Sequence, residues 1–177
     1  MNEKMIIVIT HRMVIIATVR GDLLNSKPIS GHWYIAQQCN CNTKTPYGLS
    51  DAIAKKWRYA NPYNNRRSQP DIPGSVVILE PPADPATGPT VLCLMAQWGP
   101  SKPRAYSNRY PRTYEDTYDN RKRWFQDCLE RLDDEIPDSE VVCFPYQIGC
   151  GLAGGKWTEY QKMLEDCQTQ VIIYQLP

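Results

Sequence analysis

Two kinds of hydrophobic pattern alternate along this chain, separated by segments rich in Pro, Gly and Asn. Short β-branched and aromatic runs are typical of strands, whereas apolar residues repeating every three or four positions indicate amphipathic helices. The expected strands are Met5–Ile9, Met13–Thr18, Trp33–Gln38, Ser75–Leu79, Thr90–Gln97, Val141–Phe144 and Val171–Tyr174. The expected helices are Asp51–Arg58, Tyr114–Leu132 and Trp157–Cys167.

The order of these elements predicts an α/β fold. Helices placed between strands favour parallel pairing, so we expect a three-layer α/β/α arrangement around a mixed, mostly parallel central sheet. No internal repeat or domain boundary interrupts the pattern, and 177 residues are enough to bury a sizeable core. We therefore expect a single domain over residues 1–177.

Helix ends and charged positions give more detailed expectations. Ser50 stands where an N-cap would open the first helix, and Thr113 does so for the second. The charges from Arg121 to Arg123 are expected outside the apolar face of the second helix. The polar segments 59–74 and 98–112 show no periodicity and are expected to be long loops, which in compact domains are usually functional or mobile.

Composition argues against several functional classes. A net charge of +1 and a pI near 7.5 do not favour a dedicated nucleic-acid binder or a polybasic membrane anchor. No apolar run reaches the ~20 residues of a membrane span. Seven cysteines, spread through strand-like and helix-like segments, suit reduced thiols and a cytoplasmic location. With two histidines and no Cys-x-x-Cys pair, neither a metal nor another cofactor is expected.

The most informative stretch follows the strand that ends before Pro145. Eleven residues containing four glycines lead from that proline to the helix that begins at Trp157. A strand, a glycine-rich loop and a helix form an anion site in many parallel sheets, because backbone N–H groups and the helix N-terminus both favour negative charge. The spacing fits neither the Lys-Ser/Thr phosphate loop nor the G-x-G-x-x-G turn. Spacing alone leaves a ligand loop and a plain tight turn equally open.

One acidic residue stands at a second strand end. Asp22 follows directly after the strand that ends near Thr18. Open α/β sheets bind ligands outside the carboxyl ends of their strands, so this carboxylate is a candidate ligand contact. Its alternative role is that of a solvated turn or cap residue.

The glycine-rich loop resembles the second ligand loop of macro domains, which are ADP-ribose-binding modules. The residues that carry this resemblance are Phe144-Pro145-Tyr146-x-Ile148-Gly149-Cys150-Gly151-Leu152-Ala153-Gly154-Gly155-x-Trp157. Three earlier segments are similar to macro-domain segments in the required order: Gly21–Leu23, Gln38–Cys41 and Tyr47–Ala54. The resemblance runs from about Val14 to Tyr174, and the closest branch is that of ADP-ribose 1″-phosphate phosphatases.

This resemblance implies a macro-domain-like fold and a role for each segment. Asp22 would accept a hydrogen bond from the adenine amino group, and Asn40 would bond the distal ribose hydroxyls. The alternative for Asn40 is an Asx turn at a strand end. Backbone N–H groups of two loops would hold the diphosphate. The expected contact residues are Asp22, Leu23, Asn40, Gly48, Leu49, Ser50, Ile148, Gly149, Cys150, Gly151, Leu152 and Ala153.

The same resemblance implies hydrolysis of ADP-ribose 1″-phosphate or of an ADP-ribosyl ester, with Asn40 as the candidate catalytic residue. Two departures favour the alternative of a non-catalytic reader of ADP-ribose or of ADP-ribosylated proteins. Gln37 stands where relatives carry a His, and Ala153 stands where some relatives carry a catalytic Asp. A third hypothesis is a nucleic-acid binder using the basic residues Arg58, Arg66, Arg67 and the loop from Lys102 to Arg112; the near-zero net charge makes it the weakest.

Overall fold

The computed structural model describes residues 15–29, 31–64, 66, 69–82, 88–104 and 110–177. These residues form a six-stranded sheet in the order β1-β6-β5-β2-β4-β3. The strands are β1 (Ile15–Arg20), β2 (Tyr34–Asn40), β3 (Val76–Leu79), β4 (Thr90–Gln97), β5 (Val141–Pro145) and β6 (Gln170–Gln175). The strand expected over Met5–Ile9 lies outside the described residues.

The sheet is mixed and mostly parallel, as the sequence predicts. Among the described strands, β1, β6, β5, β2 and β4 run parallel, and β3 pairs antiparallel with β4 at one edge. The carboxyl ends of the parallel strands therefore share one edge of the sheet, which we call the carboxyl edge. The loops that follow β1, β2, β4 and β5 all leave from it.

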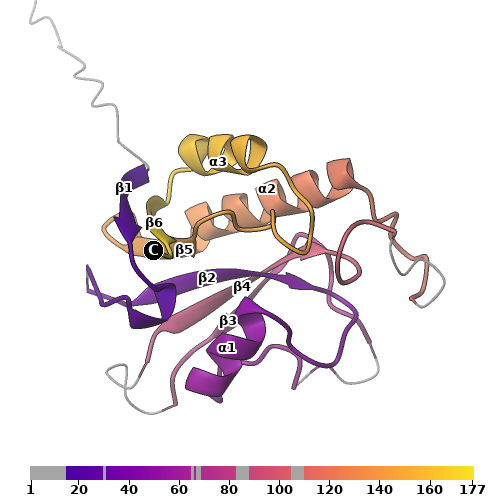
Figure 1. The fold of residues 1–177 in the computed structure, drawn as a ribbon, viewed down its shortest axis with the longest axis horizontal. Coiled ribbons are helices and arrows are strands. Elements are labelled where there is room, and N and C mark those ends of the chain that lie inside the picture. The colour runs from indigo at the N-terminus through magenta and orange to yellow at the C-terminus, as the bar shows by residue number, and fades with distance from the viewer. Residues whose placement is uncertain (1–14, 30, 65, 67–68, 83–87, 105–109) are drawn as a thin grey trace, which may run out of the picture.

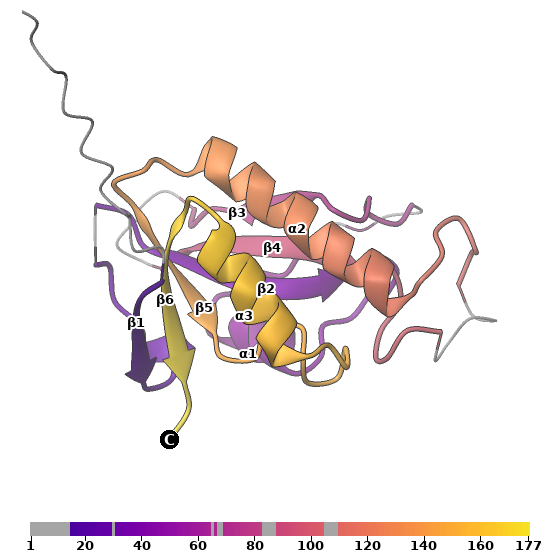
Figure 2. The same ribbon diagram turned by 90° about the horizontal axis from the view of Figure 1, so that it is seen from above.

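Three described helices make the layers on either side of the sheet (Figures 1 and 2). Helix α1 (Leu49–Lys56) covers one face, and α2 (Tyr118–Glu135) and α3 (Trp157–Asp166) cover the other. The expected α/β/α layering is thus confirmed. A short 3-10 helix, η1 (Leu23–Asn25), follows β1. Within the described part of the chain, no helix has both the length and the apolar character needed to cross a membrane.

The core fills both faces of the central strands, under α1 on one side and under α2 and α3 on the other. All eight residues of β4 are buried, because the sheet is covered on both faces there. Helix α2 packs on β4 with apolar side chains spaced three or four residues apart. Those buried side chains are Trp124, Phe125, Cys128, Leu129 and Leu132.

Helix α1 begins two residues earlier than the sequence pattern predicts, so the expectation of Ser50 as its N-cap was wrong. Gly48 is the N-cap, and this end of the helix has no side-chain capping hydrogen bond. Ser50 lies inside the first turn, where its hydroxyl donates to Oε1 of Gln37 at 2.6 Å. The buried amide of a neighbouring strand thus outcompetes the helix end for this hydroxyl.

Helix α2 begins later than expected, and Thr113 is not its N-cap. Thr117 fills that position, with its hydroxyl oxygen accepting from the backbone N–H of Asn120 at 3.1 Å. The residues before Thr117 stay outside the helix because Asp116 is bonded elsewhere. Its carboxylate accepts from the backbone N–H of Gly99 at 3.1 Å, which holds this segment against the end of β4.

Candidate ligand-binding site

Every residue that the sequence assigns to ligand contact lies at the end of a strand on the carboxyl edge, in the loop that follows, or in the first residues of the helix after it. Asp22 follows β1, Asn40 ends β2, and the segment from Ile148 to Ala153 follows β5. Helix η1 rests against β5, and Lys56 of α1 donates to backbone and side-chain oxygens of η1. The topology of the sheet therefore places the separate sequence segments at a common edge.

The two glycine-containing loops meet at this edge. A Cβ atom added to Gly48 would lie 4.0 Å from Cδ1 of Leu152, so the loop before α1 lies next to the loop after β5. We call residues 40–50 and 148–153 together the two-loop site. Leu152 and Tyr47 are both largely exposed there, with 60% and 78% of their surface accessible. The two loops that the resemblance pairs as walls are therefore neighbours in the fold.

The loop after β5 has a shape that requires glycine at position 149. Gly149 has φ of +74°, and an added Cβ would lie 2.5 Å from Cε1 of Tyr160 and 2.6 Å from Oε1 of Gln38. Its carbonyl accepts from the N–H of Gly155 at 3.0 Å, which closes the loop on itself. No other residue type fits this conformation without displacing its neighbours.

Backbone N–H groups in this loop divide into two classes. Those of Ile148 and Cys150 donate to carbonyls within the loop, at 3.2 and 2.9 Å. A second set has no hydrogen-bond acceptor within the described part of the chain, and these groups belong to Gly149, Gly151, Leu152 and Ala153. Unpaired N–H groups in a tight loop are suited to bind an anion, because fixed dipoles need no reorganisation to do so.

The opposite wall ends in an uncapped helix N-terminus. Gly48 has φ of +60° and ψ of −127°, a conformation accessible in practice only to glycine. Because Gly48 has no side chain, nothing from this residue covers the first N–H groups of α1. The first-turn donors of a helix have no partner within the helix, and its dipole makes that end partly positive. Both walls thus present backbone donors to a negative charge.

Asn40 makes the Asx turn that was its alternative role. Its Oδ1 accepts from the backbone N–H groups of Asn42 at 3.1 Å and Thr43 at 2.8 Å. Oδ1 is therefore used to shape the loop, and the side-chain amide Nδ2 is the group left to face a ligand. A ribose hydroxyl would have to accept from Nδ2.

Arg66 holds the backbone of the loop after β2 in place, a role that the sequence did not reveal. Its buried guanidinium donates to the carbonyls of Asn40 at 2.7 Å and Thr43 at 2.6 Å, and pairs with Asp71. The loop 59–74 thus supplies a buried brace. Because Arg66 is only 8% exposed, it is not available to a basic nucleic-acid surface. An Arg and an Asp five residues apart in a loop were the only sequence signal.

Arg121 braces the other wall, and the expectation that it faces solvent was wrong. Its guanidinium is 1% exposed and pairs with both carboxylate oxygens of Asp116, each at 2.6 Å. It also donates to the carbonyls of Ala153 at 3.2 Å, Gly99 at 3.1 Å and Ser101 at 2.5 Å. This one side chain therefore ties the loop after β5 to the loop after β4.

The buried position of Arg121 had a sequence signal that its charge concealed. It precedes three buried residues of α2, Trp124, Phe125 and Cys128, by three, four and seven positions, which places it on their face of the helix. Arginine is almost never fully buried unless it is paired, so a charge at this position favours exposure when no partner is known. The partner Asp116 lies outside the helix, where periodicity gives no information.

At the other end of the site, Asp22 caps η1. Its Oδ1 accepts from the backbone N–H of Leu24 at 2.9 Å, so the alternative role of cap residue is present. Oδ2 has no partner among the described residues and remains available as an acceptor. Leu23 is 5% exposed, and its side chain packs into the core rather than toward a ligand.

Groups able to activate a nucleophile are scarce here. Gln37 is fully buried and bonded to Ser50 and Cys93, so it belongs to the core. Burial, with a smaller contribution from Glu159, raises the pKa of the Cys150 thiol to about 11. A neutral thiol is a poor nucleophile. Across the described residues, His, Cys, Asp and Glu side chains form no group of three or more suited to a metal ion.

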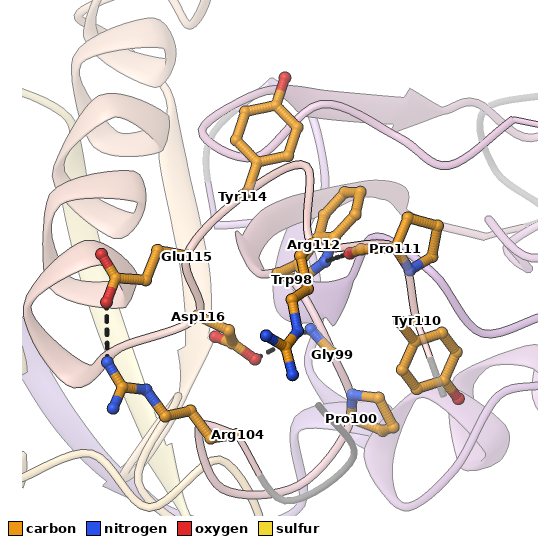
Figure 3. A pocket seen from close by; sticks show the side chains of 10 residues that line it. All are labelled: Trp98, Gly99, Pro100, Arg104, Tyr110, Pro111, Arg112, Tyr114, Glu115 and Asp116. Atoms are coloured by element: carbon orange, nitrogen blue, oxygen red, sulfur yellow. Dashed lines mark hydrogen bonds and ion pairs between the residues drawn. The ribbon is translucent and has the colours of Figure 1, made fainter. Parts of the chain in front are cut away.

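A pocket of about 480 Å³ lies beside the two-loop site, at the end of β4 (Figure 3). It is lined by Trp98, Gly99, Pro100, Arg104, Tyr110, Pro111, Arg112, Tyr114, Glu115 and Asp116, and we call it the β4 pocket. None of the residues that the sequence assigns to ligand contact lines it.

Comparison with known proteins adds no identity, since no protein-family model and no curated protein matches the chain.

Proposed function

We propose that this protein binds ADP-ribose, free or attached to a protein, at the two-loop site. One observation carries the proposal: unpaired backbone donors line both walls where the loops after β2 and β5 meet. A diphosphate carries about two negative charges, and backbone dipoles hold such a group with little desolvation cost. Among diphosphate ligands we choose ADP-ribose, because the sequence of the loop after β5 resembles a macro-domain ligand loop.

The two ends of the ligand would be held by side chains. Oδ2 of Asp22 would accept from the adenine amino group, while Oδ1 remains bonded to Leu24. Nδ2 of Asn40 would donate to a hydroxyl of the distal ribose, with Oδ1 kept in the Asx turn. Both residues are thus held by their own backbone contacts before a ligand arrives, which lowers the entropy cost of binding.

Binding without turnover is the form of this proposal that the geometry favours. Hydrolysis of a phosphate ester requires a group that activates water and a proton donor for the leaving oxygen. The residues nearest to that role are Asn40, which cannot accept a proton at neutral pH, and Cys150, whose pKa is raised. Hydrolysis of ADP-ribose 1″-phosphate is the second candidate, carried by the sequence resemblance.

Calorimetric titration with ADP-ribose tests the binding. We expect saturable binding in the micromolar range, and no heat at millimolar ligand would refute the proposal. Replacing adenine by hypoxanthine removes the amino group, so the wild type should bind the hypoxanthine analogue about tenfold more weakly. Asp22→Ala should abolish that preference, whereas Asp166→Ala, an exposed acid on α3, should retain it.

A phosphate-release assay on ADP-ribose 1″-phosphate separates the two candidates. We expect no release above the uncatalysed rate. Enzymatic release that Asn40→Ala lowers far more than it lowers affinity would establish Asn40 as catalytic and would refute the non-catalytic form. The binding proposal is judged by calorimetry alone, so the two outcomes remain separate.

A further inference from the structure

The β4 pocket has a rigid aromatic wall. Trp98 is 3% exposed, and its indole N–H donates to the carbonyl of Pro111 at 2.8 Å. The ring of Tyr114 lies 4.9 Å from that of Trp98 at an angle of 58°, and also meets Trp124 edge-on at 6.3 Å. Tyr110 lines the same pocket. Packing positions the rings of Trp98 and Tyr114, and a hydrogen bond also holds Trp98, before any ligand is present.

The charges that line the pocket leave one cation unmatched. Asp116 is bonded to Arg121 and to the N–H of Gly99, and Glu115 pairs with Arg104 at 2.7 Å. Arg112 also lines the pocket and makes no hydrogen bond or ion pair with the other lining residues (Figure 3). Figure 3 shows its guanidinium pointing inward among the lining side chains. The pocket thus combines an aromatic surface with a free positive charge.

The pocket is separate from the two-loop site but next to it. Arg121 donates to the carbonyl of Gly99, which lines the pocket, and to that of Ala153, which belongs to the two-loop site. Lys102 runs alongside Gly154, where an added Cβ would lie 3.0 Å from its Cγ. A ligand in the pocket would therefore lie beside the two-loop site without using its residues.

We infer that the β4 pocket is a second ligand site, for a nucleoside monophosphate. A volume of about 480 Å³ falls within the range of small-molecule sites. A base would pack against Tyr114, which is 36% exposed and is held in place by the buried Trp98, because aromatic faces bind any nucleobase. Its phosphate would pair with Arg112, whose planar guanidinium matches phosphate geometry. This inference does not depend on ADP-ribose binding at the two-loop site.

Titration of the full chain with AMP tests this site, with the Trp98 indole N–H resonance as a local reporter. A Trp98→Phe variant assigns that resonance. We expect AMP to shift it in a saturable manner, and Arg112→Gln to weaken this binding at least tenfold. Arg58→Gln, at an exposed arginine that follows α1 and does not line the pocket, is the matched control and should bind AMP like the wild type. Adenosine and ribose 5-phosphate should each bind more weakly than AMP, since each lacks one of the two contacts.

AMP could also enter the two-loop site, and a further variant distinguishes that outcome. If Asp22→Ala weakens AMP binding and Arg112→Gln does not, AMP occupies the two-loop site and the inference fails. A Trp98 resonance that stays unshifted at millimolar AMP also overturns it. Tyr114→Leu provides a second variant within the pocket and should weaken AMP binding while leaving the affinity for ADP-ribose unchanged.

Discussion

Replacing Arg121 by Gln should be among the most destabilising single substitutions at the candidate site. Its guanidinium is 1% exposed and satisfies five acceptor atoms, two of them on the carboxylate of Asp116, which is only 11% exposed. Glutamine is too short and uncharged, so that carboxylate would keep only the N–H of Gly99. Breaking one partner of a buried ion pair typically costs about 3–5 kcal/mol.

That loss is large compared with the ~5–15 kcal/mol total stability of a typical domain. Urea unfolding followed by circular dichroism at pH 7 measures it, with the free energy of unfolding extrapolated to water. Arg104→Gln is the matched control, because its ion pair with Glu115 is largely exposed and should contribute no more than about 1 kcal/mol.

A double-mutant cycle tests the cause of the expected loss. If the unpaired carboxylate is responsible, Asp116→Asn combined with Arg121→Gln should be much less destabilising than the sum of the single changes. A loss below about 1 kcal/mol for Arg121→Gln would refute the reasoning, because the buried pair could then not be holding the two loops together.

Three further predictions concern the loops, a helix end and a thiol. Gly149→Ala should lower the free energy of unfolding by about 2 kcal/mol or more, because the new methyl group is strained at positive φ and clashes with Tyr160. Gly151→Ala is the control in the same urea assay: nothing lies within 4 Å of its new methyl group, so the free energy of unfolding should change by less than about 0.5 kcal/mol. Thr117→Ala should cost about 1 kcal/mol by removing the cap of α2, and an equal cost for Thr113→Ala would contradict the observed helix start. Because burial raises the pKa of Cys150 to about 11, only about one thiol in a thousand is ionised at pH 8. Alkylation of Cys150 by iodoacetamide, measured by mass spectrometry, should therefore accelerate about tenfold per pH unit up to pH 10. A plateau in the alkylation rate below pH 9 would contradict the raised pKa.

Local pattern was sufficient for most of the secondary structure. The runs ending near Gln38, Leu79 and Gln97 became β2, β3 and β4, since β-branched and aromatic alternation reports directly on a buried sheet. The helix starts were less accurate. Ser50 and Thr113 are both good N-caps by residue type, but one hydroxyl is bonded to Gln37 and the other lies outside the helix. A cap depends on competing partners, which a local pattern does not contain.

The sequence by itself determined the α/β class, the alternation of elements and the segments that supply the candidate ligand loops. It did so because hydrophobic periodicity and glycine placement are local properties of the chain. Only the tertiary structure decided that Arg66 and Arg121 are buried braces, because each is stabilised by carbonyls and carboxylates distant in sequence. The same holds for the β4 pocket, whose aromatic wall and free Arg112 arise where the end of β4 meets the segment before α2.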